Sequence, residues 1–154
     1  MKSTLGRLRL LASLTFAISV VLGVLGITAL VPDPGLEGDV LFWIPAAVAV
    51  LGLVGVKHVV DPLLIPKRDM SPGRVSKMVN SMMGARLLAA VTPTVAGLAV
   101  GLAAQSDPSV LVGSGASVVM LSHWWPGRQF ENVVRAKLLP VGGAELAGRV
   151  LRPL

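Results

Sequence analysis

The chain lacks cysteine and tyrosine and has few charged residues. Lys, Arg, Asp and Glu together make up 14% of its 154 residues, and aromatic residues make up 4%. The absence of cysteine excludes a disulfide scaffold and a zinc site built on cysteine. A soluble domain usually carries about a quarter charged residues, and a disordered chain has low hydrophobicity. With 53% hydrophobic residues, this chain fits neither class.

Long apolar runs account for the missing charge. Four stretches, each between 17 and 22 residues long, contain no Asp, Glu, Lys or Arg: residues 10–31, 40–56, 87–104 and 108–125. Each is long enough to cross a hydrocarbon core of about 30 Å, and backbone groups in lipid must bond within a helix. Too little other chain remains to cover four such helices in a soluble core. The first run is longer than the apolar region of a cleaved signal peptide, so it is interpreted as a retained helix.

These runs predict an all-α membrane protein with four transmembrane helices, forming one domain over residues 1–154 with an amphipathic cytoplasmic tail at 126–154.

The tails and connections alternate along the chain between basic and acidic segments. The first loop contains Asp33, Glu37 and Asp39 and the third contains Asp107, with no basic residue in either. The 14 basic residues lie in the N-terminal tail, the middle connection with its helix ends, and the C-terminal tail: Lys2, Arg7, Arg9, Lys57, Lys67, Arg68, Arg74, Lys77, Arg86, Arg128, Arg135, Lys137, Arg149 and Arg152.

Basic connections favour the cytoplasmic side, so this pattern predicts both termini inside. A composition rich in Ala, Gly, Val, Leu and Arg is typical of a bacterium with high genomic GC content, which predicts the plasma (inner) membrane. The net charge of +6 does not predict nucleic-acid binding. Beside membrane helices, the basic residues set topology and attract the anionic headgroups of lipids, the first predicted partner.

Small residues recur at helical spacing and predict close packing between helices. The candidate packing positions are Ser19, Gly23, Gly52, Gly55, Ala89, Gly97, Gly101, Gly113 and Ser117. They serve either contacts within the bundle or contacts with another subunit. Trp43, Trp124 and Trp125 stand at run ends, where indoles anchor a helix at the membrane interface. The Trp pair could alternatively stack on a ligand.

Two cytoplasmic segments are amphipathic. After Ser71-Pro72, a typical helix start, an apolar face forms and the helix continues through Gly84 into the third run. The second segment begins after Pro126-Gly127 and is expected to be interrupted at Pro140 and Gly142-Gly143. These segments either lie on the membrane surface or dock a partner. Their apolar positions are Val75, Met78, Val79, Met82 and Met83 in the first, and Phe130, Val133, Val134 and Leu138 in the second.

Few residues point to chemistry. No ionisable residue lies at membrane depth, where a proton- or ion-coupled transporter needs one, and Thr92 and Thr94 are expected to bond the carbonyls that Pro93 frees. His58, Asp61 and His123 form a weak candidate cluster of two histidines and one carboxylate, a set that can hold a metal. The alternative is that the histidines are interfacial and that Asp61 pairs with Lys57 or caps a turn before Pro62. No catalytic residue, metal site or cofactor is therefore predicted.

The favoured function is a non-enzymatic accessory or scaffold subunit of a larger membrane complex, such as a lipid or solute transporter or a respiratory or export assembly, with other integral membrane subunits as partners. One alternative is a small homo-oligomeric channel or carrier for apolar or lipidic cargo. Another is a membrane-embedded enzyme acting on lipid headgroups at the cytoplasmic face through His58, Asp61 and His123.

Overall fold

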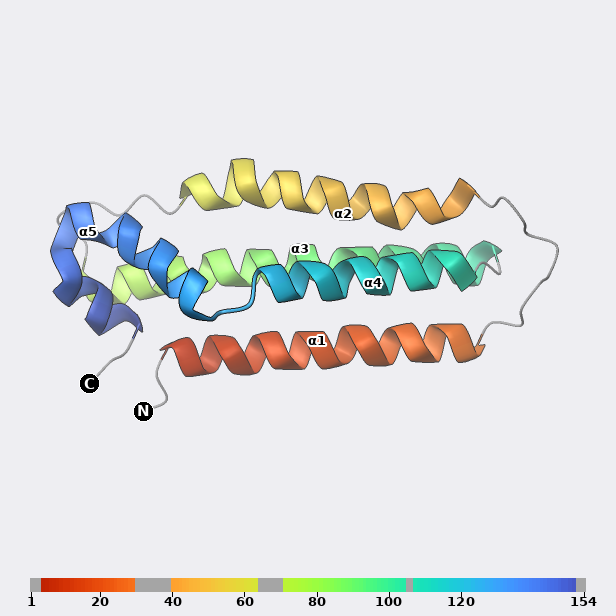
Figure 1. The fold of residues 1–154 in the computed structure, drawn as a ribbon, viewed down its shortest axis with the longest axis horizontal. Helices are drawn as coiled ribbons and strands as arrows, with labels where there is room; N and C mark the ends of the chain where they lie inside the picture. The colour runs from red at the N-terminus through yellow and green to blue at the C-terminus, as the bar shows by residue number, and fades with distance from the viewer. Residues whose placement is uncertain (1–3, 30–39, 64–70, 105–106, 152–154) are drawn as a thin grey trace.

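The computed structural model describes residues 4–29, 40–63, 71–104 and 107–151, and every regular element in that part of the chain is helical. The chain begins with α1, continues with a second helix made of several successive turns, and ends with the helices α3, α4 and α5 (Figure 1). In chain order the elements are α1 (Thr4–Ala29), the 3-10 turn η1 (Val40–Phe42), α2 (Trp43–Gly55), the π-helical turn η2 (Val56–Val60), the 3-10 turn η3 (Asp61–Leu63), α3 (Pro72–Ala104), α4 (Asp107–His123) and α5 (Arg128–Leu151).

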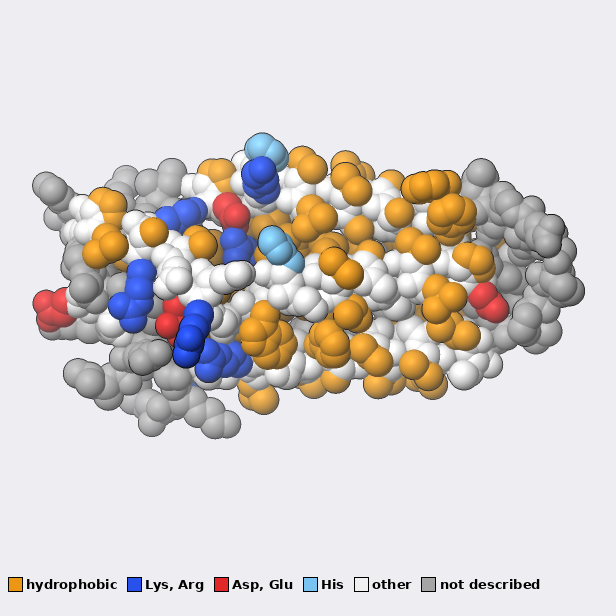
Figure 2. Space-filling model, in the orientation of Figure 1, with side chains coloured by type: hydrophobic (Ala, Val, Ile, Leu, Met, Phe, Trp, Pro, Cys, Tyr) orange, Lys and Arg blue, Asp and Glu red, His pale blue; other side chains and the backbone are white. Residues whose placement is uncertain are grey.

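The helices α1 to α4 run side by side and alternate in direction, while α5 crosses one end of this bundle (Figure 1). The central helix is α3, which contacts α1, α2, α4 and α5. Because the direction alternates, the start of α1, the start of α3 and α5 all lie at the same end. We call this the basic end, since the described basic side chains gather there (Figure 2).

Three helical segments among the described residues are long and apolar enough to cross a membrane: Leu5–Thr28, Trp43–Val60 and Pro72–Ala104. The all-helical fold predicted from the sequence is therefore confirmed among the described residues, and these three segments fit a membrane protein. The remaining bundle helix, α4, has 17 residues, a length of about 25 Å at the usual helical rise. Its span is thus slightly shorter than a typical hydrocarbon core of about 30 Å.

The outer surface of the bundle is unusually apolar. Many large aliphatic side chains on α1 to α4 are exposed, among them Leu51 at 69%, Leu88 at 75% and Val119 at 69%. Away from the basic end, hydrophobic side chains are spread along the whole face drawn in Figure 2, and almost no charged side chain lies among them. Soluble monomers rarely expose a contiguous apolar surface of this extent, whereas lipid is a suitable solvent for it.

The predicted helix limits shift in several places. The first run begins earlier than residue 10, because α1 starts at Thr4, and the fourth ends at His123, before the two tryptophans. The amphipathic segment after Ser71 and the third run form one continuous 33-residue helix. Residues 30–31 of the first run, the loop acids Asp33, Glu37 and Asp39, and the connection 64–70 lie outside the described residues.

The predicted interruption of the tail helix at Pro140 and Gly142-Gly143 is wrong. The helix α5 continues from Arg128 to Leu151 with Pro140 inside it. Proline removes one backbone hydrogen bond and its ring presses on the preceding turn, which bends a helix without necessarily ending it. Figure 1 shows α5 turning sharply partway along its length.

Glycines bring α3 and α4 into backbone contact. A Cβ added at Gly97 would lie 2.5 Å from the Ser109 carbonyl oxygen and 3.1 Å from the Gly113 Cα. A Cβ at Gly113 would in turn meet the Pro93 carbonyl oxygen and the Gly97 Cα. No side chain larger than hydrogen fits between these helices at this level. The small-residue spacing of the sequence therefore marks a real helix crossing.

The other predicted packing positions divide between the interior and the surface. A Cβ at Gly23 would press on the Ser114 side chain, and one at Gly52 would come within 3.4 Å of the Ala89 carbonyl oxygen. Ser19 and Ser117 are fully buried, and Gly101 is also buried. Gly55 differs, because nothing lies within 4 Å of an added Cβ there. Its position on α2 is open.

Pro93 is accommodated by a polar contact between helices. The Thr94 backbone N–H donates to the Ser117 hydroxyl oxygen at 3.1 Å, and the Thr94 hydroxyl lies 2.7 Å from the same oxygen. Thr92 bonds back to the Leu88 carbonyl of its own helix at 2.8 Å. The expectation for both threonines was therefore wrong, because the Thr94 hydroxyl bonds to α4 and the Thr92 hydroxyl bonds to Leu88, whereas Pro93 frees the carbonyl four residues before it. Buried polar groups need such partners in a dry interior.

At the basic end, the first part of α3 and the first part of α5 belong to one hydrophobic core. Their inward side chains have almost no exposed surface: Val75, Val79, Met83, Val134 and Leu138 are each 0% exposed. The two amphipathic segments, expected to lie on the membrane surface or to dock a partner, thus contribute their apolar faces to the protein interior. Val133 is the exception in the predicted stripe and is 44% exposed.

Candidate functional site

An open cavity of about 460 Å³ lies at the basic end, bounded by the end of α2 with η2 and η3, by α3, by the end of α4 and by α5. We call it the basic-end cavity. Its lining combines charged, aromatic and aliphatic side chains: Leu53, Val56, Lys57, Asp61, Arg86, His123, Trp124, Trp125, Gln129, Phe130 and Val133. A pocket of mostly apolar walls with a few converging polar groups is typical of a ligand site.

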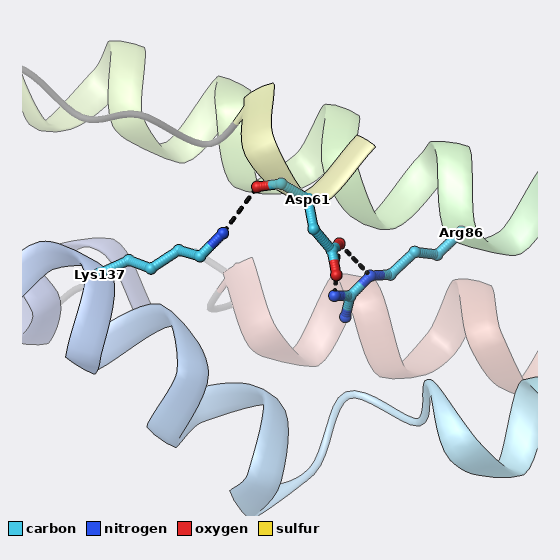
Figure 3. Close-up of polar contacts among 3 residues, drawn as sticks. All are labelled: Asp61, Arg86 and Lys137. Atoms are coloured by element: carbon cyan, nitrogen blue, oxygen red, sulfur yellow. Dashed lines mark hydrogen bonds and ion pairs between the residues drawn. The ribbon is translucent and has the colours of Figure 1, made fainter. Parts of the chain in front are cut away.

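Asp61 joins three elements beside this cavity (Figure 3). Its carboxylate oxygen Oδ1 accepts hydrogen bonds from Arg86 Nη2 at 2.7 Å and from Arg86 Nε at 3.2 Å. Its backbone carbonyl accepts a hydrogen bond from Lys137 Nζ at 2.6 Å. Asp61 thereby ties the end of the second helix to α3 through its side chain and to α5 through its backbone.

A wide helical turn positions Asp61. The backbone N–H of Asp61 donates to the Val56 carbonyl oxygen, which is the spacing of a π-helix. In such a turn the hydrogen bond spans five residues, one more than in an α-helix. Single π-helical turns are frequent at functional sites. The last helical turn described here ends at Leu63, and carbonyls in the final turn of a helix lack partners within it, so the Asp61 carbonyl can accept the hydrogen bond from Lys137.

Arg86 is the most enclosed charged residue of the cavity wall, with 8% of its surface exposed. Its guanidinium carbon lies 5.9 Å from the ring centroid of Phe130, a cation–π distance. A buried charge needs a partner, and Asp61 supplies it. Because Nε and Nη2 of Arg86 both donate to Oδ1 of Asp61, the guanidinium is held in a fixed orientation beside the cavity.

A second set of contacts holds α5 on the bundle. From α1, Arg9 donates through Nε to the Pro126 carbonyl oxygen at 3.0 Å, and its Nη2 lies 3.9 Å from Glu131 Oε1. Glu131 is buried even though it is charged. Together with the apolar contacts of Phe130, these interactions fix the turn between α4 and α5, which carries the two cavity tryptophans.

The structure brings together only part of the predicted polar cluster. Asp61 and His123 both line the basic-end cavity, whereas His58 is exposed and does not line it. Among the described residues, no group of three or more His, Cys, Asp and Glu side chains is arranged to hold a metal ion. Asp61 pairs with Arg86 and not with Lys57, which the sequence had suggested as its partner.

The three predicted interface tryptophans occupy different environments. Trp43 is 62% exposed, and its ring lies 4.8 Å from that of Phe42 at the other end of the bundle. Trp125 is half-exposed and lines two surface hollows, the basic-end cavity and a shallower one between α1 and α4. Trp124 is 7% exposed and belongs to the hydrophobic core, so its position is interior.

Sequence reasoning missed Arg86, Lys137 and Gln129 as site residues. Arg86 was counted only as a topology-setting charge, although a basic residue within a long helix, next to an apolar run, often has a buried partner. Gln129 and Lys137 stand on α5 and gain their roles only when α5 packs across the bundle. No short motif marks any of them.

Comparisons with protein-family models, with curated protein sequences and with solved structures find no match for this chain.

Proposed function

We propose that this chain is a non-enzymatic accessory or scaffold subunit of a larger membrane complex, resident in a bacterial plasma membrane as a four-crossing protein with both termini in the cytoplasm. The observation that carries the proposal is the closed interior of the bundle. At its centre Gly97 and Gly113 touch, and the buried hydroxyls of Thr94 and Ser117 bond to each other. A carrier or channel within one chain would need a polar path at this depth.

The four-crossing topology is supported by the charge distribution. The described basic side chains gather at one end (Figure 2), whereas the opposite end contains Asp107 at the start of α4. Cytoplasmic enrichment in Lys and Arg would place the basic end inside. The 17 residues of α4 would span the membrane with the help of Trp125 at its inner boundary or by local thinning of the bilayer.

Because the chain has no cysteine, single-cysteine labelling can test this topology without background. Ala103→Cys lies near the end of α3 and Gly73→Cys near its start, and both positions are exposed. With an impermeant maleimide on intact cells, we expect labelling at position 103 and protection at position 73 until the cells are lysed. Labelling of position 73 on intact cells would contradict the orientation.

The accessory role is tested by extracting the protein in a mild detergent and identifying its companions by mass spectrometry. We expect larger membrane subunits in fixed stoichiometry. A homo-oligomer without other subunits would favour the alternative of a small channel or carrier.

Docking through α5 is tested by Ala136→Glu with Leu139→Glu, because both residues are exposed on α5. Companions that remain bound to this variant would assign docking to the membrane helices.

The basic-end cavity favours a second candidate, an enzyme that acts on lipid headgroups at the membrane surface. Asp61 and His123 line one cavity and would be its acid–base pair. His123→Ala is matched by His58→Ala, an exposed histidine outside the lining. Under this candidate only His123→Ala changes the lipid composition of the cells. The same composition in both variants and the parent would reject it.

A further inference from the structure

We propose that the basic-end cavity binds a phosphate group, carried by the headgroup of an anionic phospholipid or by a small soluble phosphate. The inference concerns binding alone, so it stands apart from both candidate functions above.

The donor groups of the cavity outnumber its acceptors. Lys57 and Arg86 are cationic, and the indoles of Trp124 and Trp125 and the side chains of His123 and Gln129 can donate hydrogen bonds. Asp61 is the one carboxylate among the lining residues, and its Oδ1 already accepts two hydrogen bonds from Arg86. The unused hydrogen-bonding capacity is thus mostly that of donors, which suits an anion.

Arg86 is prepared for such a ligand. Asp61 occupies its Nε and one Nη2 position, while the guanidinium has five N–H groups in a rigid fork. The two hydrogen bonds to Asp61 orient the fork, and the Phe130 ring lies at a cation–π distance of 5.9 Å from its central carbon. Lys57 is exposed on η2 at the mouth of the same cavity. A phosphate in the cavity would therefore contact a fixed cation from α3 and a flexible one from η2.

The remaining walls suit the part of a lipid next to its headgroup. Leu53, Val56, Phe130 and Val133 are apolar and line the cavity together with the two tryptophans. The cavity lies where the apolar surface of α2 and α4 gives way to the basic end, which is the depth of headgroups if these helices span the membrane. A soluble phosphate would use the polar wall only.

Two matched pairs of exposed positions separate a defined site from general attraction of anionic lipid to the basic end. Lys57→Gln removes a charge at the cavity, and Lys77→Gln removes one from the same end outside it. Gln129→Glu adds an acid to the cavity wall, and Asn132→Asp adds one to α5 outside it. Each substitution is at an exposed position, so folding is preserved, and tryptophan fluorescence checks this.

The experiment measures lipid retained by the full chain after purification from vesicles of phosphatidylcholine mixed with phosphatidylglycerol, by native mass spectrometry. We expect one phosphatidylglycerol per chain, retained in preference to phosphatidylcholine. Lys57→Gln, which removes a cationic donor, and Gln129→Glu, which replaces a donor by an acid, should each weaken retention by about tenfold, a change of about 1.4 kcal/mol. Lys77→Gln and Asn132→Asp should retain it as the parent does.

The source of the phosphate is decided by adding inorganic phosphate. If phosphate displaces the lipid and binds the delipidated chain with the same dependence on Lys57 and Gln129, the natural ligand is a soluble phosphate. If it does not, the ligand is the lipid. Equal losses in all four variants, equal retention of both lipids, or no binding of either probe would overturn the proposal.

Discussion

The apolar part of the bundle and its basic end are held together by different means. In the apolar part, α3 and α4 meet through Gly97 and Gly113 with no side chain between them. At the basic end, long side chains bridge the elements, as Arg86 and Lys137 do at Asp61. Lipid removes the hydrophobic drive for helix association and leaves close contact as the main attraction. Near water, burial of aliphatic side chains and charged hydrogen bonds both contribute.

The difference explains where a cavity can form. Helices in backbone contact leave no space between them, whereas side-chain bridges hold helix ends apart at a fixed distance. The cavity of about 460 Å³ accordingly lies among the bridged ends of α2, α3 and α4 and under α5. The cavity thus lies where side chains, and not backbone contacts, join the helices.

The largest expected effect comes from placing a large side chain in the backbone contact. Gly97→Leu would drive its Cβ against the Ser109 carbonyl oxygen, and because backbone must move, the cost should exceed the roughly 1–3 kcal/mol typical of overpacking. We expect loss of the monodisperse protein peak in size-exclusion chromatography. Gly115→Leu is the control, since nothing lies within 4 Å of an added Cβ there. A normal peak for Gly97→Leu would show that the helices do not touch.

A smaller effect is expected from breaking the bridge at the basic end. Asp61→Ala leaves the guanidinium of Arg86 enclosed without its partner, which should lower the free energy of unfolding by about 2 kcal/mol. The measurement is thermal unfolding in detergent. Adding Arg86→Met to Asp61→Ala should recover most of the loss, because the pair is then replaced by apolar surface. Additive losses in the double variant would mean that the two residues are not coupled.

The polar contact inside the apolar part should contribute less. Ser117→Ala removes the acceptor of the Thr94 N–H and its hydroxyl partner, and hydrogen bonds between membrane helices are worth about 0.6 kcal/mol each. We expect a loss of about 1 kcal/mol in the same unfolding assay. Ser122→Ala, whose hydroxyl bonds to the Val118 carbonyl of its own helix, should change little. Similar losses in both variants would mean that the effect does not come from the contact between Thr94 and Ser117.

The smallest effect is expected at the bend of α5. Pro140 is exposed, so Pro140→Ala removes no buried contact and should not lower the unfolding free energy by more than about 0.5 kcal/mol. Alanine, unlike proline, can also donate a backbone hydrogen bond within the helix. Leu138 is only two residues away but fully buried, and Leu138→Ala should lose about 2–5 kcal/mol. If both variants unfold alike, α5 does not pack on the bundle as described.

The sequence predicted those features that depend on local composition or on regular spacing. The apolar runs predicted the helices. The regular spacing of small residues around Gly97 in one run and around Gly113 in the next indicated close packing, although it did not show which helices pack together. The Asp61–Arg86 pair could not be predicted, because it depends on how α2 and α3 are rotated about their axes, and the π-helical turn changes that rotation. Lys57, the neighbour one turn away, was the obvious partner on a regular α-helix.

The tail was harder to predict because its tertiary contacts override its local signals. Pro140 favours a helix end, yet α5 continues past it. Trp124 and Trp125 are adjacent and identical in type, but only Trp124 lies in the core. A turn between two helices points successive side chains in different directions, and nothing in the residue types themselves decides which one faces inward.

The π-helical turn at Val56–Val60 changes the direction in which the residues after it point around the helix axis. On an unbroken α-helix each residue advances by about 100°, so deleting one residue within the turn would swing Asp61 by roughly that angle, away from Arg86. A protein could in this way gain or lose the whole junction by the insertion or deletion of a single codon. The apolar residues of α2, which precede the turn, would keep their places.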